Sequence, residues 1–349
     1  MKIRSMLFAV VLLGLALAGG AAKAITLPSC NPGVTCLQFG DFNVYSLPLL
    51  NLQATGSSVP SPGDPFFVSS TYGQIQTDTI IGINNGQCTN TGNPTGSMDC
   101  SYNTPSPNNT TNVTFSTDTT ADPGGLGEFA GDIQAWDATI SALSAVDNAP
   151  PGPLVAYFAF NETGSGTGLL TTDLLVWAQV QICDLDAGGI GCQTVYLGGN
   201  TKPSIAAGDL PAPDGSDANG SANAGTPLGF GSWVYVHAGI CADAAGNFLG
   251  FPDTSGNCAS GTVRNQNNLG QNAAAFAIDS PLLDSLLLNP AYDVIHVTWL
   301  MAYINGGGET AFILPTASVV PEPGTILLLG IGLLIVAGLS TGRSRRTVK

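Results

Sequence analysis

Residues 293–304 read DVIHVTWLMAYI, and residues 173–183 read DLLVWAQVQIC. The first stretch is apolar at both odd and even positions, so it predicts a central strand that is buried on both faces. The second stretch alternates toward its end, which places Trp177, Gln179 and Gln181 on one face of a strand. Both stretches favour β-structure because Val, Ile, Thr and aromatic residues dominate them.

Shorter segments of similar composition occur along the chain, separated by runs rich in Gly, Pro, Asn and Ser, which favour turns. Many short strands with turns between them are typical of an antiparallel β-sandwich or jelly roll, and this is the fold class that we expect. The segments predict strands at 42–45, 66–72, 75–83, 112–117, 154–160, 193–197, 232–240, 273–278 and 310–314.

Two segments favour short helices that would cover the sheets. Apolar residues recur at intervals of three and four over residues 131–147, which fits one face of a helix. Ser280 followed by Pro281 predicts the start of a second helix, with Ser as the N-cap and Pro at the first helical position. Asn289 and Pro290 predict its end.

The charge of the chain is strongly asymmetric. Between Ile25 and Val320 the only cationic residues are Lys202 and Arg264, against 23 of the chain's 24 Asp and Glu residues, all but Glu322. This leaves a formal net charge near −21 for that region. Such a surface excludes nucleic acid as a partner and disfavours anionic lipid, because few cations are present to replace counterions. Weak calcium contacts are compatible with it, and so is an acidic surface with no ligand.

All eight cysteines lie in this acidic region, and their even number predicts disulfides in an oxidising compartment. Zinc is disfavoured because there is no C-x-x-C pair and the chain has only two His residues. Each short disulfide loop is expected to contribute roughly 2–3 kcal/mol to stability. From proximity in sequence we expect the pairs Cys30–Cys36, Cys88–Cys100, Cys183–Cys192 and Cys241–Cys258.

Asp184 and Asp186 form a candidate calcium site. The two carboxylates are two residues apart on a Gly-rich turn, and oxygen ligands at this spacing can hold Ca²⁺. The pattern is not that of an EF-hand, because Gly188 occupies the third ligand position. A plain hairpin turn closed by the expected Cys183–Cys192 disulfide explains the same residues. We therefore expect no obligatory cofactor, with calcium as the alternative.

Trp233, Tyr235 and His237 share one face of a predicted strand and are the candidate ligand-binding residues. Rows of aromatic side chains can stack against the apolar faces of sugar rings. Packing in the core is the competing interpretation, and the same choice applies to the face that carries Trp177. His296 lies in the most apolar predicted strand, and we expect it to be a hydrogen-bonded core residue.

Catalytic motifs are scarce in this sequence. There is no G-x-S-x-G nucleophile elbow, and cysteines paired in disulfides leave no thiol nucleophile. Pairs of carboxylates that might hydrolyse glycosidic bonds can be found among so many acids. Their separation in space, which decides the chemistry, cannot be read from sequence. We expect a protein that is not an enzyme.

The N-terminal residues have the features of a signal peptide. Lys2 and Arg4 precede an apolar run at 6–18, and Ala22 and Ala24 supply the small residues that signal peptidase reads. We expect cleavage after Ala24, so that residues 1–24 are removed.

The C-terminal residues contain a second apolar segment. Residues 325–340 read TILLLGIGLLIVAGLS, which corresponds to about 25 Å of helix and predicts a transmembrane helix in the precursor. Arg343, Arg345 and Arg346 follow, and the positive-inside rule places them in the cytoplasm.

Val320, Pro321, Glu322 and Pro323 stand directly before this segment. The Pro-Glu-Pro tripeptide at 321–323, the apolar helix and the arginine-rich end together resemble the PEP-CTERM sorting signal over residues 319–349. The resemblance implies processing by an exosortase-type enzyme in a Gram-negative bacterium and an association with exopolysaccharide and biofilm matrix. The inner membrane would then hold the protein only as a precursor, and the mature chain would lack the transmembrane helix.

These features divide the chain into a signal peptide at 1–24, a β-rich ectodomain at 25–318 and a sorting tail at 319–349. A weak boundary near 121–127 is compatible with two parts of the ectodomain, and a single elaborated sandwich fits the length equally well. We expect a structural or adhesive role at the cell surface or in the exopolysaccharide matrix. A calcium-dependent carbohydrate-binding module and a polysaccharide-active enzyme on a jelly-roll scaffold are the alternatives.

Overall fold

The fold was taken from a computed structural model of the chain. The chain divides into two compact units, residues 1–316 and residues 317–349. The signal peptide, Cys88, Cys100 and the predicted transmembrane segment lie outside the described residues. The structure describes residues 25–70, 79–83, 98–99, 101–103, 113–117, 135–147, 154–161, 174–184, 191–206, 209–210, 232–253, 256–269, 273–304 and 309–315.

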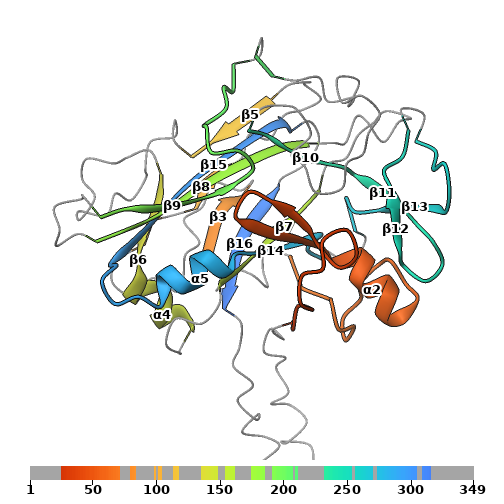
Figure 1. The fold of residues 1–349 in the computed structure, drawn as a ribbon, viewed down its shortest axis with the longest axis horizontal. Helices are drawn as coiled ribbons and strands as arrows, with labels where there is room; N and C mark the ends of the chain where they lie inside the picture. The colour runs from red at the N-terminus through yellow and green to blue at the C-terminus, as the bar shows by residue number, and fades with distance from the viewer. Residues whose placement is uncertain are drawn as a thin grey trace, which may run out of the picture. The chain divides into compact units, whose positions relative to one another are not determined.

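Antiparallel β-sheets dominate the described part, as the sequence predicted (Figure 1). The described strands form three sheets, called here the first, second and third sheet. The third sheet is the smallest and has the strand order β12 (Phe248–Gly250), β11 (Gly239–Ala242) and β13 (Thr262–Asn265). The second sheet has the order β10 (Val234–Val236), β8 (Leu174–Cys183), β15 (Val294–Ile304) and β5 (Val113–Ser116), with β9 (Gln193–Leu197) beside β8 and β6 (Trp136–Thr139) beside β15. The first sheet has the order β1 (Leu37–Phe39), β2 (Phe42–Ser46), β14 (Phe276–Asp279), β7 (Leu154–Ala159), β16 (Thr310–Pro315), β3 (Thr79–Ile83) and β4 (Tyr102–Asn103), in which only β3 and β4 are parallel.

Strands β8 and β15 form the longest pairing in the described part, from Val294 opposite Cys183 to Ala302 opposite Leu175. One face of this pair joins side chains of the first sheet in the main hydrophobic core. The rings of Phe158 on β7 and Trp299 on β15 meet there, with centroids 5.9 Å apart. Alternate residues of β15 and β8 supply the core, namely Ile295, Val297, Trp299, Met301, Val176, Ala178, Val180 and Ile182.

The opposite faces of both large sheets are also buried. On the second sheet, Leu175, Trp177 and Leu300 belong to a separate cluster with less than 1 % of their surface exposed. On the first sheet, Tyr157 and Phe312 pack in another cluster, with ring centroids 5.7 Å apart. The two-sided burial predicted for residues 293–304 is therefore present.

Helix α5 (Pro281–Leu287) begins where the sequence predicted. The Ser280 side chain accepts a hydrogen bond from the Leu283 backbone N–H at 3.2 Å, as an N-cap does. Helix α2 (Leu47–Thr55) was not predicted, although it begins in the same way, with Ser46 as its N-cap and Pro48 in its first turn. Its leucines pack against both the first and the third sheet.

The predicted helix over 131–147 is wrong at residues 136–139, and residues 131–134 lie outside the described part. Residues 136–139 form strand β6, and helix α4 (Ile140–Asp147) begins only after them. The register pairs Trp136 with Val297 and Thr139 with Val294, so pairing with β15 overrides the helical spacing of the apolar residues.

Two predicted strands also differ from the structure. The described part of 66–72 contains only an isolated bridge between Ser69 and Ala273. The predicted strand 232–240 is split, because β10 belongs to the second sheet and β11 belongs to the third. His237 and Ala238 form the junction between them.

Three disulfides join the cysteines that are close in sequence: Cys30–Cys36, Cys183–Cys192 and Cys241–Cys258. The second closes the connection between β8 and β9, and the third ties β11 to the loop after β12. The fourth expected pair, Cys88–Cys100, remains a prediction.

None of the helices in the described ranges has the length and apolar character that crossing a membrane requires.

Gly198 is expected to be essential for joining β9 to the segment before β10. Its φ is +101°, and an added Cβ would press against the backbone oxygen of Ser232. Gly63 has the same φ, +102°, with nothing within 4 Å of a Cβ, and is a matched control. We expect Gly198→Ala to lower the free energy of unfolding by at least about 2 kcal/mol and Gly63→Ala by about 1 kcal/mol. Urea unfolding of the oxidised protein measures both, and equal losses would refute the steric explanation.

Candidate functional site

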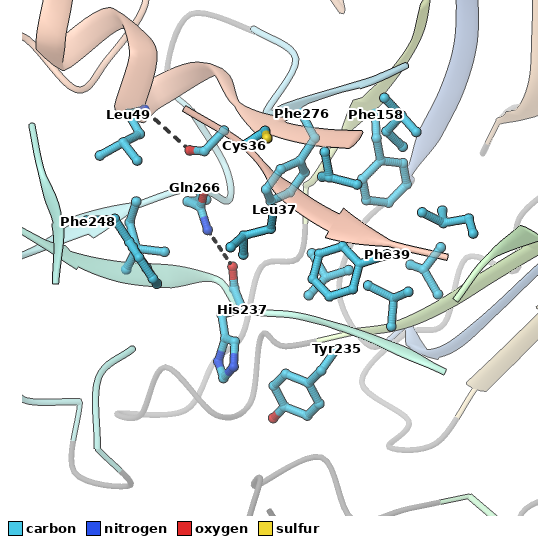
Figure 2. A pocket seen from close by; sticks show the side chains of 18 of the residues that line it. Cys36, Leu37, Phe39, Leu49, Phe158, Tyr235, His237, Phe248, Gln266 and Phe276 are labelled. Carbon is cyan, nitrogen blue, oxygen red and sulfur yellow. Dashed lines mark hydrogen bonds between the residues drawn. The ribbon is translucent and has the colours of Figure 1, made fainter. Parts of the chain in front are cut away.

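A cavity of about 100 Å³ lies between the two large sheets, at the end where the third sheet joins them. Its wall is almost wholly apolar and strongly aromatic (Figure 2). The first sheet contributes Phe39, Phe158 and Phe276, and the second contributes Trp299. Strand β12 of the third sheet contributes Phe248, and the loop that follows β12 contributes Phe251.

The split between β10 and β11 positions this wall. The chain leaves the second sheet at His237 and continues into the third sheet. The aromatic residues of the third sheet therefore lie opposite those of the first sheet. The His237 ring stacks on Phe251 with centroids 4.0 Å apart and lies 4.4 Å from the ring of Tyr235. Phe248 meets Phe251 edge-on at 5.2 Å. These rings form one continuous aromatic cluster at the edge of the cavity.

Gln266 is the polar residue in this wall that is most completely buried, with 3 % of its surface exposed. Its backbone N–H donates to the Ala238 carbonyl at 2.8 Å, and its side-chain Nε2 donates to the His237 carbonyl at 3.2 Å (Figure 2). A carbonyl can only accept, so this bond fixes which end of the amide is nitrogen. The other end, Oε1, has no hydrogen-bond partner.

The proposed sugar-stacking row is not exposed. Trp233 and Tyr235 are only 2 % and 6 % exposed, and they pack with Trp177, Leu300 and Tyr303 on the second sheet. Trp177 is fully buried, and its Nε1 donates to the Gly199 carbonyl at 2.8 Å. The burial of these side chains favours the core interpretation, and ligand binding by Trp233 and Tyr235 stays a prediction. Alternation in the sequence could not distinguish an exposed platform from a core, because it does not show whether other residues cover the face.

The calcium hypothesis stays a prediction. Asp184 is half-buried directly after β8, and Asp186 lies outside the described residues. Within the ranges that the structure describes, no three His, Cys, Asp or Glu side chains gather in a way that could hold a metal ion.

His296 is a hydrogen-bonded core residue, as its sequence context predicted. It is 8 % exposed, and its Nδ1 lies 2.6 Å from Oδ1 of Asp137 on the adjacent strand β6. The Asp137 backbone N–H donates to Asp99 at 2.9 Å. This buried polar network ties β6 and the segment at 98–99 to the central strand.

A pair of carboxylates, Asp279 and Asp284, was not singled out from the sequence. Burial raises the pKa of Asp284 to about 6; a hydrogen bond from the Leu154 N–H opposes this rise, and the nearby charge of Asp279 adds to it. Burial also raises the pKa of Asp279, opposed by a hydrogen bond from Asn43. The two residues are close in sequence, but their desolvation depends on burial in the fold, which sequence spacing does not signal.

The raised pKa of Asp284 predicts a pH-dependent stability. The pKa of Asp284 in the folded protein exceeds that of an Asp in the unfolded chain. The contribution of Asp284 to the free energy of unfolding is therefore complete below about pH 4 and is lost as the pH rises through about 6. Asp284→Asn keeps an acceptor for the Leu154 N–H and removes the charge. We compare the free energy of unfolding of the variant with that of the wild type at each pH. This difference should be about 1 kcal/mol more favourable to the variant at pH 7 than at pH 4, a small value because Asp284 is partly exposed to solvent. Urea unfolding at both pH values measures this gain, and a difference that does not change with pH would contradict the assignment.

Comparisons with known proteins give two matches. The PEP-CTERM protein-sorting motif matches residues 319–346, which confirms the resemblance drawn from residues 320–323 and the arginine-rich end. The protein is thus a secreted bacterial protein that is processed by exosortase and exported to the cell envelope or surface. A search of the curated proteins and a search of the solved structures found no match. A family model described as Domain of unknown function (DUF8239) matches residues 25–300, well over half of the chain, and the protein therefore belongs to the DUF8239 family.

Proposed function

We propose that the mature protein is a non-catalytic structural or adhesive component of the cell surface or of its exopolysaccharide matrix. The observation that carries this proposal is the sorting motif at 319–346, placed directly after a folded β-rich unit. Proteins with this signal are exported and released from their membrane anchor. A component used outside the cell must then keep its fold without chaperones or a reducing cytosol.

The architecture of the described part supports such a role. Three disulfides hold local loops, and buried clusters cover the outer faces of both large sheets. In the proposed function the two sheets act as a rigid β-sandwich with few places where proteolysis can begin. The strong negative charge keeps copies dispersed during export and allows divalent cations to bridge the protein to acidic matrix polymers.

The absence of catalysis is part of the proposal. Asp137 and His296 support it, because their hydrogen bond lies within the second sheet, where it links neighbouring strands. Asp284 likewise accepts a hydrogen bond from the Leu154 backbone and thereby holds α5 against β7. Structural roles of this kind account for these titratable groups without a substrate.

Replacement of Pro321, Glu322 and Pro323 by alanine tests the export step. We expect the wild-type chain in surface and matrix fractions, beginning at Ile25 and ending near residues 321–323. Its intact mass should be eight hydrogens below that of the reduced chain, which corresponds to four disulfides. The variant should stay in the inner membrane and retain its arginine-rich end. Mass spectrometry of both fractions measures this, and wild-type protein confined to the inner membrane would contradict the proposal.

The same two chains test the role in the matrix. Cells that lack the protein should retain less exopolysaccharide, and the wild-type chain should restore retention whereas the membrane-trapped variant should not. Normal retention without the protein would contradict a structural role, even if export and processing proceed as expected.

A further inference from the structure

We propose that the outer face of the second sheet carries a binding patch for a neutral polysaccharide. The patch consists of half-buried side chains on three neighbouring strands: Gln179 and Gln181 on β8, Thr194 and Tyr196 on β9, and Thr298 on β15. The inference rests on the proposed surface role and names the chemistry of the matrix partner, an uncharged polymer rich in hydroxyl groups.

The register of the strands brings the five side chains together (Figure 1). Gln181 lies opposite Thr194, and Gln179 lies between Tyr196 on one neighbouring strand and Thr298 on the other. The residues that alternate with them on all three strands belong to the main hydrophobic core, so the patch faces away from the core. From the ordinary spacing of strands and of residues along a strand, the patch measures about 10 Å by about 7 Å.

The patch is open to a ligand, unlike its neighbours on the same face. On one side Trp177 and Leu300 lie in the buried aromatic cluster, and on the other His296 pairs with the buried Asp137. In contrast, the side chains of the two glutamines and two threonines of the patch make no hydrogen bond within the ranges that the structure describes. A ligand can therefore reach four groups, each of which both donates and accepts hydrogen bonds.

Tyr196 adds apolar surface beside these polar groups. Its ring packs against Trp177 with centroids 6.3 Å apart, at the border of the buried aromatic cluster, and it remains half-buried. A sugar ring has an apolar face of C–H groups and a rim of hydroxyl groups. An aromatic ring next to amides and hydroxyls complements both parts of such a ring.

The charge of the patch decides which class of polysaccharide it fits. None of its five residues is charged, and the only cations between Ile25 and Val320 are Lys202 and Arg264, against 23 acidic residues. An acidic polysaccharide would be repelled by this net charge and would find no cationic partner in the patch. The uncharged donors and acceptors therefore select a neutral polymer when no metal ion bridges the two.

Calorimetry on the oxidised mature protein, purified from its host, tests the patch. The probes are cellohexaose, maltohexaose and mannohexaose, which are neutral, and hexagalacturonate, which is anionic. EDTA is present throughout to remove bridging cations. We expect at least one neutral probe to bind and hexagalacturonate not to bind.

Variants of the patch locate the binding. Gln181→Ala and Thr298→Val should each weaken binding of the neutral probe about fivefold, from one lost hydrogen bond. Gln193→Ala, at the exposed start of β9 and outside the patch, is the matched control and should leave the affinity unchanged. Far-UV circular dichroism should be the same for all three variants, because none of the replaced side chains makes a hydrogen bond in the described part.

Three results would overturn the proposal: binding of no neutral probe, binding of hexagalacturonate as tight as that of the neutral probes, or wild-type affinity in both patch variants. The first of these would leave the patch as a solvated sheet face. Export and matrix retention are measured on cells, whereas these outcomes concern the purified protein. Failure of the patch is therefore distinguishable from failure of the proposed surface role.

Discussion

Burial of strand β15 on both faces is the constraint on which the rest of the fold depends. One face of the strand packs against the first sheet, and the other lies under a separate aromatic cluster. A strand buried in this way cannot tolerate a shift of register, because every shift by one residue exchanges the two faces. Its long pairing with β8 and its polar contact with β6 through His296 and Asp137 fix that register.

The cavity also depends on the position of β15 between its neighbours. Trp299 faces the first sheet from β15 and forms part of the cavity wall, and Val176 does so from the paired strand β8. The third sheet closes the same space because the chain changes sheets at His237. A rigid, disulfide-held scaffold suits a protein that must persist outside the cell.

Sequence patterns predicted the elements whose signals are local. Composition predicted the strands at 173–183 and 293–304. Capping residues Ser280 and Pro281 predicted the start of a helix, and proximity in sequence predicted three disulfide pairs. Signals that depend on neighbours in space failed: β6 has helical spacing, and pairing with β15 made it a strand. Trp233 and Tyr235 share a face as predicted, but only the covering of that face decides between a platform and a core. Gln266 carried no signal, because its burial beside the third sheet arises only from the fold.

Amide hydrogen exchange followed by mass spectrometry tests the central role of β15 most directly. If this strand organises the fold, the amides of β8 and β15 exchange only through global unfolding, and those of β11, β12 and β13 exchange earlier through local opening. Exchange of β15 as fast as that of β12 would contradict the account, because the strand buried on both faces would then not be the most protected part of the molecule.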